Sequence, residues 1–150
     1  MKIWIDADAC PKMVKEVIYT VSARLKINVN VVANSYQSIP HSPLIQFIKV
    51  EQGADVADFY IVQNLSPGDL VITADIPLAA LIIEKNATAL NPRGEIYTED
   101  NINERLSMRN FLHDLRENEG LNTGGPAPLS KKDREIFINS FDRIIVKLMK

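Results

Sequence analysis

The sequence predicts an α/β fold built on a mostly parallel central sheet. Short apolar or β-branched segments alternate with longer segments whose apolar residues recur at helical spacing, and this alternation is typical of strand–helix–strand units. Residues that favour turns, such as glycine, proline and asparagine, stand between the segments. One domain is expected over residues 1–150, because a chain of this length with 46% apolar residues can bury a single core.

The first half of the chain predicts three strands and two helices. The first strand is a β-branched and aromatic run, and Pro11 suits the first position of the helix that follows it. A loop with two prolines separates the second strand from the third, and Gly53 precedes the second helix. These elements are expected at residues 2–6, 11–26, 28–33, 44–50 and 54–65.

The next segments predict three more strands and one helix, expected at residues 69–73, 76–85, 87–90 and 95–97. The run at 69–73 is apolar without alternation, as expected for a central strand that is covered on both faces. Asn86 suits the carboxyl cap of the helix. Residues 91–94 read Asn-Pro-Arg-Gly, which indicates a turn between the last two strands.

The final third of the chain is predicted to be helical on both sides of a loop at residues 120–129, which is rich in glycine and proline. The helix before the loop follows Thr98 and carries apolar residues in register at Ile102, Leu106, Leu112 and Leu115. Ser130 and Asp133 form a capping-box pattern that starts the last helix. This helix is expected to bury Ile136, Phe137, Phe141, Ile144 and Leu148.

Composition excludes several classes of protein. The net charge of −2 excludes a uniformly basic nucleic-acid binder, so any such role requires a local basic patch. Cys10 is the only cysteine, which leaves no intrachain disulfide and no cysteine-based zinc site. No apolar stretch approaches the length of about 18 residues that a membrane span requires. We therefore expect a cytoplasmic protein that does not cross a membrane.

Acidic residues follow two of the predicted strands at their carboxyl ends. Asp6 closes the first strand, Asp8 follows two residues later, and Asp75 comes shortly after the apolar run that ends at Thr73. Ligands of open parallel sheets bind beyond the carboxyl ends of the strands. An acid at the tip of a buried strand is costly unless it is paired or capped, so Asp6 and Asp75 favour a functional role.

Two further acids lie near the start of the second predicted helix. Asp55 and Asp58 are three residues apart and share a helix face, and the chain returns close to them at Asp75. Crowded carboxylates raise one another's pKa unless a cation neutralises them, and oxygen ligands favour Mg²⁺ or Mn²⁺. We expect one or two such ions on Asp6, Asp8, Asp55, Asp58 and Asp75, with Asp6, Asp8, Asp58 and Asp75 as the catalytic residues.

Several of these residues also have a purely structural interpretation. Asp8 would accept backbone N–H groups at the start of the first helix, and Asp55 would be a surface acid that complements a helix dipole. Cys10 suits a small buried residue better than a nucleophile, since no histidine or basic partner is near it in sequence. His41 and His113 suit surface or packing positions.

Candidate phosphate-binding residues stand in two places. Asn91 and Arg93 lie in the turn just beyond a strand tip, and Lys131, Lys132 and Arg134 lie at the amino end of the last helix. We expect these residues to bind substrate, with solvated surface charge as the alternative. The first strand–helix turn is no glycine-rich phosphate loop or dinucleotide fingerprint, so no nucleotide cofactor is indicated.

Five motifs together resemble the YaiI/YqxD family of uncharacterised bacterial proteins. They are IDADACP at 5–11, GADVAD at 53–58, DIPLAA at 75–80, NPRG at 91–94 and GGPAP at 124–128. That family is in turn similar to PIN-like domains, which are metal-dependent ribonucleases with a three-layer α/β/α sandwich. The resemblance implies this fold and gives Asp6, Asp58 and Asp75 the places of the nuclease acids. Asp8 or Asp55 would replace a further glutamate that these nucleases carry.

Three functions follow from these observations. The first is Mg²⁺- or Mn²⁺-dependent hydrolysis of RNA, with a metal-activated water as the nucleophile. The second is a non-catalytic PIN-like protein that binds RNA or a protein partner. The third is a HAD-like phosphatase with Asp6 as the nucleophile, because Asp-x-Asp ends the first strand.

Overall fold

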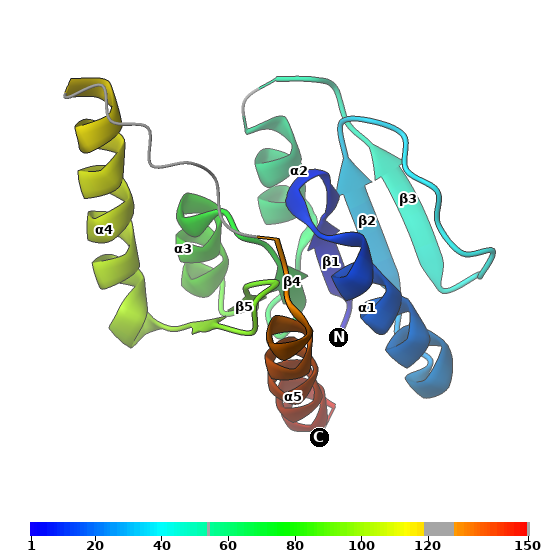
Figure 1. Ribbon diagram of the computed structural model, residues 1–150. Helices are drawn as coiled ribbons and strands as arrows, with labels where there is room; N and C mark the ends of the chain where they lie inside the picture. The colour runs from blue at the N-terminus through cyan, green and yellow to red at the C-terminus, as the bar shows by residue number, and fades with distance from the viewer. Residues whose placement is uncertain (54, 119–127, 150) are drawn as a thin grey trace.

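The protein forms an open six-stranded sheet with helices on both faces (Figure 1). The computed structural model describes residues 1–53, 55–118 and 128–149. The elements are β1 (Ile3–Asp6), η1 (Ala7–Ala9), α1 (Lys12–Leu25), β2 (Val29–Ala33), β3 (Ile45–Lys49), α2 (Val56–Asn64), β4 (Leu70–Ile72), α3 (Ile76–Glu84), β5 (Thr88–Leu90), β6 (Ile96–Tyr97), α4 (Glu99–Asn118) and α5 (Lys131–Leu148). The predicted α/β class and the three-layer α/β/α arrangement are confirmed.

The strands follow the order β3-β2-β1-β4-β5-β6. Strand β1 pairs in parallel with β2 on one side and with β4 on the other, while β6 pairs antiparallel with β5. The chain therefore builds outward from β1 to β3 and then returns to continue in the opposite direction from β4. Open α/β sheets bind ligands where the strand order reverses, which in this sheet is the carboxyl edge between β1 and β4.

The two faces of the sheet carry separate cores. Ile3 and Ile5 point toward the side of α1 and α5, whereas Trp4 points toward the side of α2 and α3. This alternation follows from the two-residue period of a strand. Both faces are apolar, which explains why the central strands read as continuous apolar runs. The sheet is thus fixed on both sides, and its carboxyl edge is a rigid platform.

Helix boundaries agree closely with the predicted ones. Pro11 is the residue before α1, one position earlier than predicted, because its extended backbone makes it the amino cap. Asn86 has a left-handed φ of 62° directly after Lys85, the carboxyl cap of α3, as a helix-ending residue should. Within the described residues, no helix is both long enough and apolar enough to cross a membrane.

The last helix has the predicted capping box but not the full predicted core face. The Ser130 side chain accepts the backbone N–H of Asp133, and Asp133 accepts that of Ser130. Phe137 and Phe141 are fully buried, one turn apart. Ile136 was expected in the core, and this was wrong because it lies beside that face and is 41% exposed.

Helix α4 contacts the core mainly through its first turns. Ile102 is buried and Leu106 is partly buried against α3, whereas Leu112 is 37% exposed. The predicted apolar face therefore packs on the core at the amino end of the helix and not along its whole length. Most of the loop predicted at residues 120–129 lies outside the described residues.

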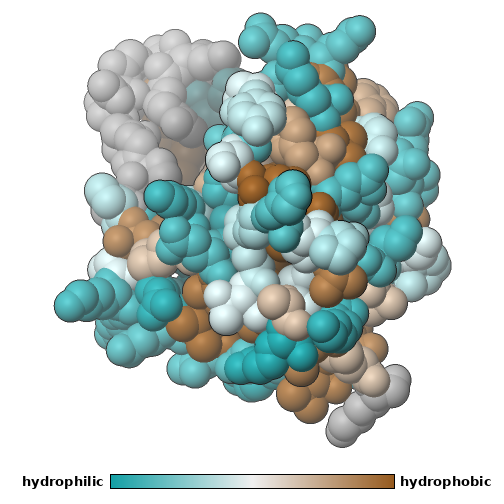
Figure 2. All heavy atoms as spheres, turned by 90° about the vertical axis from the view of Figure 1, so that its right-hand side faces the viewer, coloured by the Kyte–Doolittle hydropathy of each residue, from teal (hydrophilic) through white to brown (hydrophobic). Residues whose placement is uncertain are grey.

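Both edge strands carry features that limit further strand pairing. At β6, Asn101 donates through Nδ2 to the carbonyl of Ile96 and accepts the backbone N–H of Thr98. At β3, Gln46 and Lys49 are exposed. Figure 2 shows the molecule from the β3 side, where hydrophilic side chains surround separate apolar areas. Charged or covered edges reduce aggregation through added strands.

Candidate metal centre

The carboxyl edge between β1 and β4 begins with Asp6. This residue ends β1 and is 9% exposed, and its Oδ2 accepts a hydrogen bond of 2.9 Å from the Thr73 hydroxyl. Burial raises the pKa of the Asp6 carboxyl above its usual value, the bond from Thr73 lowers it, and the nearby charges of Asp75 and Asp8 raise it. Asp6 is therefore a buried acid in an acidic neighbourhood.

Asp75 is fixed by hydrogen bonds on both sides of the loop after β4. It is the amino cap of α3, and its Oδ1 accepts the backbone N–H of Leu78 at 2.9 Å. Its own backbone N–H donates to the Thr73 hydroxyl oxygen at 3.0 Å. The Asp75 carboxylate also shares a side-chain hydrogen bond with Asp58, so these two acids are in direct contact.

Asp55 and Asp58 reach the same place from α2. Asp55 precedes the helix with a left-handed φ of 66°, and Asp58 lies in its first turn. One carboxylate oxygen each from Asp55, Asp58 and Asp75 lies within 4.8 Å of the others. Burial raises the pKa of Asp58 to about 7, and the charges of Asp75, Asp6 and Asp55 raise it in the same direction. Three of the five predicted acids, from the starts of α2 and α3, thus lie together.

Asp8 occupies a different position from the three clustered acids. It is exposed, and it accepts the backbone N–H of Asn34 at 2.8 Å and the hydroxyl of Ser35 at 3.4 Å. The alternative that Asp8 caps the first helix is wrong, because the amino cap of α1 is Pro11 and this end of the helix has no side-chain capping bond. Among the described residues, Asp6 and Asp8 lie outside the group whose oxygens are within 4.8 Å.

Of the five predicted phosphate-binding residues, Asn91 and Arg93 have structural partners, and the other three are exposed. Arg93 forms an ion pair of 2.9 Å with Asp133 in the first turn of α5. Asn91 donates to the Tyr97 hydroxyl and accepts the backbone N–H of Arg93. Lys131, Lys132 and Arg134 are exposed at the start of α5. The turn after β5 is therefore tied to the end of α5 that carries these cations.

A cavity of about 540 Å³ lies between Arg93 and the residues next to Asp8 and Asp75. Its lining includes Ala9 from the loop after β1, Ala74 beside Asp75, and Arg93 from the turn after β5. The lining is mostly apolar, with prolines and a leucine from the same loops. The structure therefore offers a volume beside the acids in which part of a substrate can lie.

Two expectations about other reactive side chains are in line with the structure. Cys10 is buried, and this burial raises the pKa of its thiol to about 12, so the thiol stays protonated. His41 and His113 are exposed. Thr73, Asn34 and Ser35 are residues that sequence reasoning did not assign to the site. The sequence could have indicated Thr73, since it ends the predicted strand before Asp75. Nothing in the sequence distinguishes Asn34 and Ser35 from other loop residues.

The fold and the site define an α/β protein with an acidic cluster at the reversal point of a doubly wound sheet. The chain belongs to the uncharacterised bacterial YaiI/YqxD family, whose sequence profile matches residues 4–147. It is 53% identical to a UPF0178 protein of Shewanella amazonensis over 150 residues, all of both chains. It is 54% identical to a UPF0178 protein of Syntrophotalea carbinolica over 147 residues, 98% of this chain and 99% of the relative. No solved structure matches the chain significantly.

Proposed function

We propose that the protein is a Mg²⁺- or Mn²⁺-dependent phosphodiesterase of the PIN-like class that hydrolyses RNA in the bacterial cytoplasm. The observation that carries the proposal is the approach of Asp55, Asp58 and Asp75 to within 4.8 Å of one another, with buried Asp6 behind them. These acids come from the end of β1, the start of α2 and the start of α3, at the edge where open α/β sheets bind their ligands. The single cysteine supports a reducing compartment.

The donor set fits a hard divalent cation. All the candidate ligands are carboxylate oxygens, which Mg²⁺ and Mn²⁺ prefer over nitrogen or sulfur. The pKa of Asp58 is raised first by burial and then by the negative charges of Asp75, Asp6 and Asp55, which no cation compensates among the described residues. A divalent cation bound here would supply that compensation and the Lewis acidity that phosphodiester hydrolysis requires.

Each acid then has a distinct task. Asp58 and Asp75 are the main ligands, since both are half-buried and fixed on helix ends. Asp55 is exposed and completes the group from the solvent side. Asp6 accepts the Thr73 bond and adds negative charge from within the fold. The chain thereby holds the oxygen ligands in place before substrate arrives.

RNA is the proposed substrate because Arg93 lines a cavity that also includes Ala74, the neighbour of Asp75, and because further cations begin α5. Lys131, Lys132 and Arg134 are exposed at the amino end of α5 and are suited to backbone phosphates. Arg93 lines the 540 Å³ cavity while it is held by Asp133, which fixes its direction. A phosphate placed between the cations and the acids would be positioned for attack.

The other two functions have less support. A HAD-like phosphatase needs an accessible nucleophile, whereas Asp6 is 9% exposed and its Oδ2 is bonded to Thr73. A non-catalytic binding protein would use the same surface without the acids. The experiments below separate this alternative from catalysis.

The first experiment is calorimetric titration of the protein with Mn²⁺. We expect saturable binding to the wild type and its loss in Asp58→Asn/Asp75→Asn, which keeps side-chain size but removes two charges. Asp114→Asn/Asp142→Asn removes two exposed acids on α4 and α5 and should bind like the wild type. Absence of binding to the wild type would overturn the metal centre.

The second experiment measures cleavage of a labelled single-stranded RNA in Mn²⁺. The rate should fall in Asp58→Asn/Asp75→Asn by more than the about 10- to 100-fold loss that follows substitution of groups that only support a metal ligand. The Asp114→Asn/Asp142→Asn control should keep the wild-type rate. Mn²⁺ binding together with RNA binding, but without cleavage in any divalent metal, would favour the non-catalytic alternative.

A further inference from the structure

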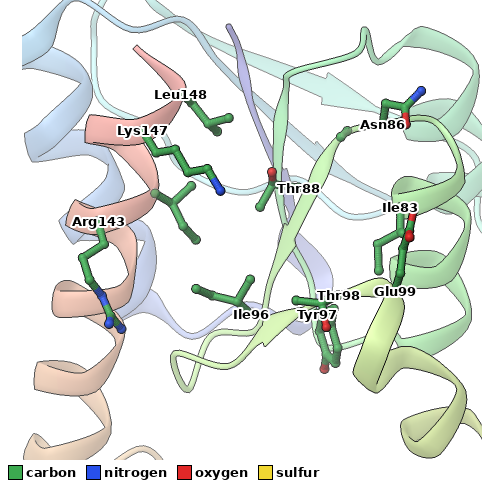
Figure 3. Close-up of a pocket in the computed structure, with 12 residues that line it drawn as sticks. Ile83, Asn86, Thr88, Ile96, Tyr97, Thr98, Glu99, Arg143, Lys147 and Leu148 are labelled. Carbon is green, nitrogen blue, oxygen red and sulfur yellow. The ribbon is translucent and has the colours of Figure 1, made fainter. Parts of the chain in front are cut away.

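A cavity lies at the edge of the sheet opposite to the acidic cluster. Its volume is about 610 Å³, within the range of sites that hold small organic ligands. It is bounded by the amino end of β5, the start of α4 and the last turns of α3 and α5 (Figure 3). The acids of the proposed metal centre follow the carboxyl ends of β1 and β4. The cavity is therefore a separate site, and its role does not depend on the proposed nuclease activity.

The wall of the cavity is chemically mixed. Apolar surface comes from Ile83, Ile96, Ile144 and Leu148, on α3, β6 and α5. Polar side chains come from Thr88, Thr98 and Asn86. In Figure 3, Thr88 lies between α5 and α3, whereas the Asn86 amide lies beside α3 and points away from α5. Such a lining suits a ligand that has an apolar body and a polar end.

Two cations on α5 indicate that the polar end of such a ligand is negatively charged. Arg143 and Lys147 are one helical turn apart and line the cavity together. Figure 3 shows Lys147 extending from α5 in the direction of Thr88. Both ion pairs among the described residues involve other side chains, and the Arg143 contact with the Ser140 hydroxyl is long, at 3.5 Å. Glu99 is the one acid among the described lining residues, so the lining carries a net positive charge.

We propose that this cavity binds a small organic anion whose carboxylate or phosphate group pairs with Arg143 and Lys147. The apolar body of the ligand would lie against Ile96 and Ile144, and the Thr88 hydroxyl would donate to the anionic head. Arginine and lysine together with hydroxyl donors recognise both oxyanions, and charge-assisted hydrogen bonds are the strong ones in such sites. The cavity is thus a ligand site distinct from the metal centre.

The test is an amide chemical-shift titration of the isotope-labelled protein with phenyl phosphate, phenylacetate and benzyl alcohol. We expect saturable shifts at Thr88, Thr98 and Lys147 with at least one of the two anions, and the better anion identifies the head group. The neutral alcohol should bind at least about fivefold more weakly, because it cannot pair with the cations. Absence of saturable shifts at these residues with both anions would overturn the proposal, as would equally tight binding of the alcohol.

Charge removal provides the second measurement. Arg143→Gln/Lys147→Gln should weaken binding of the anion by about tenfold or more, because each hydrogen bond to a charged group contributes substantially to the free energy of binding. Lys12→Gln/Arg24→Gln is the matched control, because both residues are exposed on α1 and away from this cavity. Unchanged affinity in the first variant, or an equal loss in the control, would contradict a site defined by these two cations.

Discussion

The Thr73 hydroxyl donates to Asp6 Oδ2 at 2.9 Å and so links the end of β4 to the end of β1. The Thr73 hydroxyl oxygen also accepts the backbone N–H of Asp75 at 3.0 Å. Thr73 is 1% exposed, so water cannot replace either bond. One buried hydroxyl therefore sets the position of Asp6 and of the loop that carries Asp75.

Thr73→Val should destabilise the protein because it removes the hydroxyl and keeps the shape. The Asp6 carboxylate would lose its donor, and its pKa, already raised by burial, would rise further. We expect the free energy of unfolding at pH 8 to fall by about 1–3 kcal/mol, measured by urea denaturation. Thr73→Ser retains the donor and should lose clearly less. Equal losses in the two variants would show that the hydrogen bond is not the cause.

The raised pKa of Asp58 predicts a specific dependence of stability on pH. Its pKa is about 7 in the folded protein against a usual 3.8, so folding favours the protonated form. The contribution of Asp58 to stability is therefore full below about pH 4 and is lost as pH rises through 7. In chelator, Asp58→Asn should melt at a higher temperature than the wild type at pH 8, with a smaller difference at pH 5. Asp142→Asn should leave the pH profile unchanged.

Metal binding should follow the same titration in the opposite sense. A proton and a cation compete for the Asp58 carboxylate, so Mn²⁺ affinity is expected to fall as pH drops from 8 to 6. Calorimetry in two buffers of different ionisation enthalpy measures the protons released on binding. Proton release near pH 7 should disappear in Asp58→Asn, and release that persists would assign the titrating group elsewhere.

Asp69 is a buried acid with a purely structural role. It is 3% exposed and accepts the indole N–H of Trp4 at 3.0 Å and the backbone N–H groups of Lys2 and Ser66. Asp69→Asn replaces one acceptor oxygen with a donor, so we expect a loss of about 1–3 kcal/mol in unfolding free energy. Fluorescence of Trp4, the only tryptophan, reports the local change. Mn²⁺ affinity should remain that of the wild type, because Asp69 lies at the amino end of β4; lost affinity would contradict this assignment.

The acidic edge was predictable because its signals are local. Asp6 ends a run of apolar residues, Asp75 follows another, and Asp58 lies in the first turn of a clear helix. In a parallel sheet these positions share one edge whichever strands are neighbours. The order of the strands was not predictable, because pairing between β1 and β4 depends on contacts between residues more than 60 positions apart.

Other features depend on contacts that no local pattern contains. Asp8 is held by Asn34 and Ser35, which the sequence places in an ordinary loop. Ile136 has the apolar character of a core residue, yet Phe137 and Phe141 fill the core and leave it at the margin of the helix face. The direction of a helix relative to its neighbours decides such positions, and this direction is set by tertiary packing.

Gly94 and Gly68 form a natural pair for testing how closely α5 packs on the turn after β5. Both have positive φ, 95° and 89°, where an alanine is strained. A Cβ at Gly94 would lie 2.6 Å from Ile136 Cγ2 and 2.9 Å from the Ile136 carbonyl, whereas a Cβ at Gly68 meets nothing within 4 Å. The Gly94 carbonyl also accepts the buried Ser140 hydroxyl at 2.7 Å.

Gly68→Ala should therefore measure backbone strain alone, with a loss of about 1–2 kcal/mol in unfolding free energy. Gly94→Ala adds a clash with the backbone of α5, so we expect a further loss of about 1–3 kcal/mol. Urea denaturation of both variants gives the difference directly. Because the turn also carries Arg93, the shift of α5 in Gly94→Ala should weaken RNA binding, while Gly68→Ala should leave it unchanged. Equal stability losses would mean that α5 can move away from the turn at little cost.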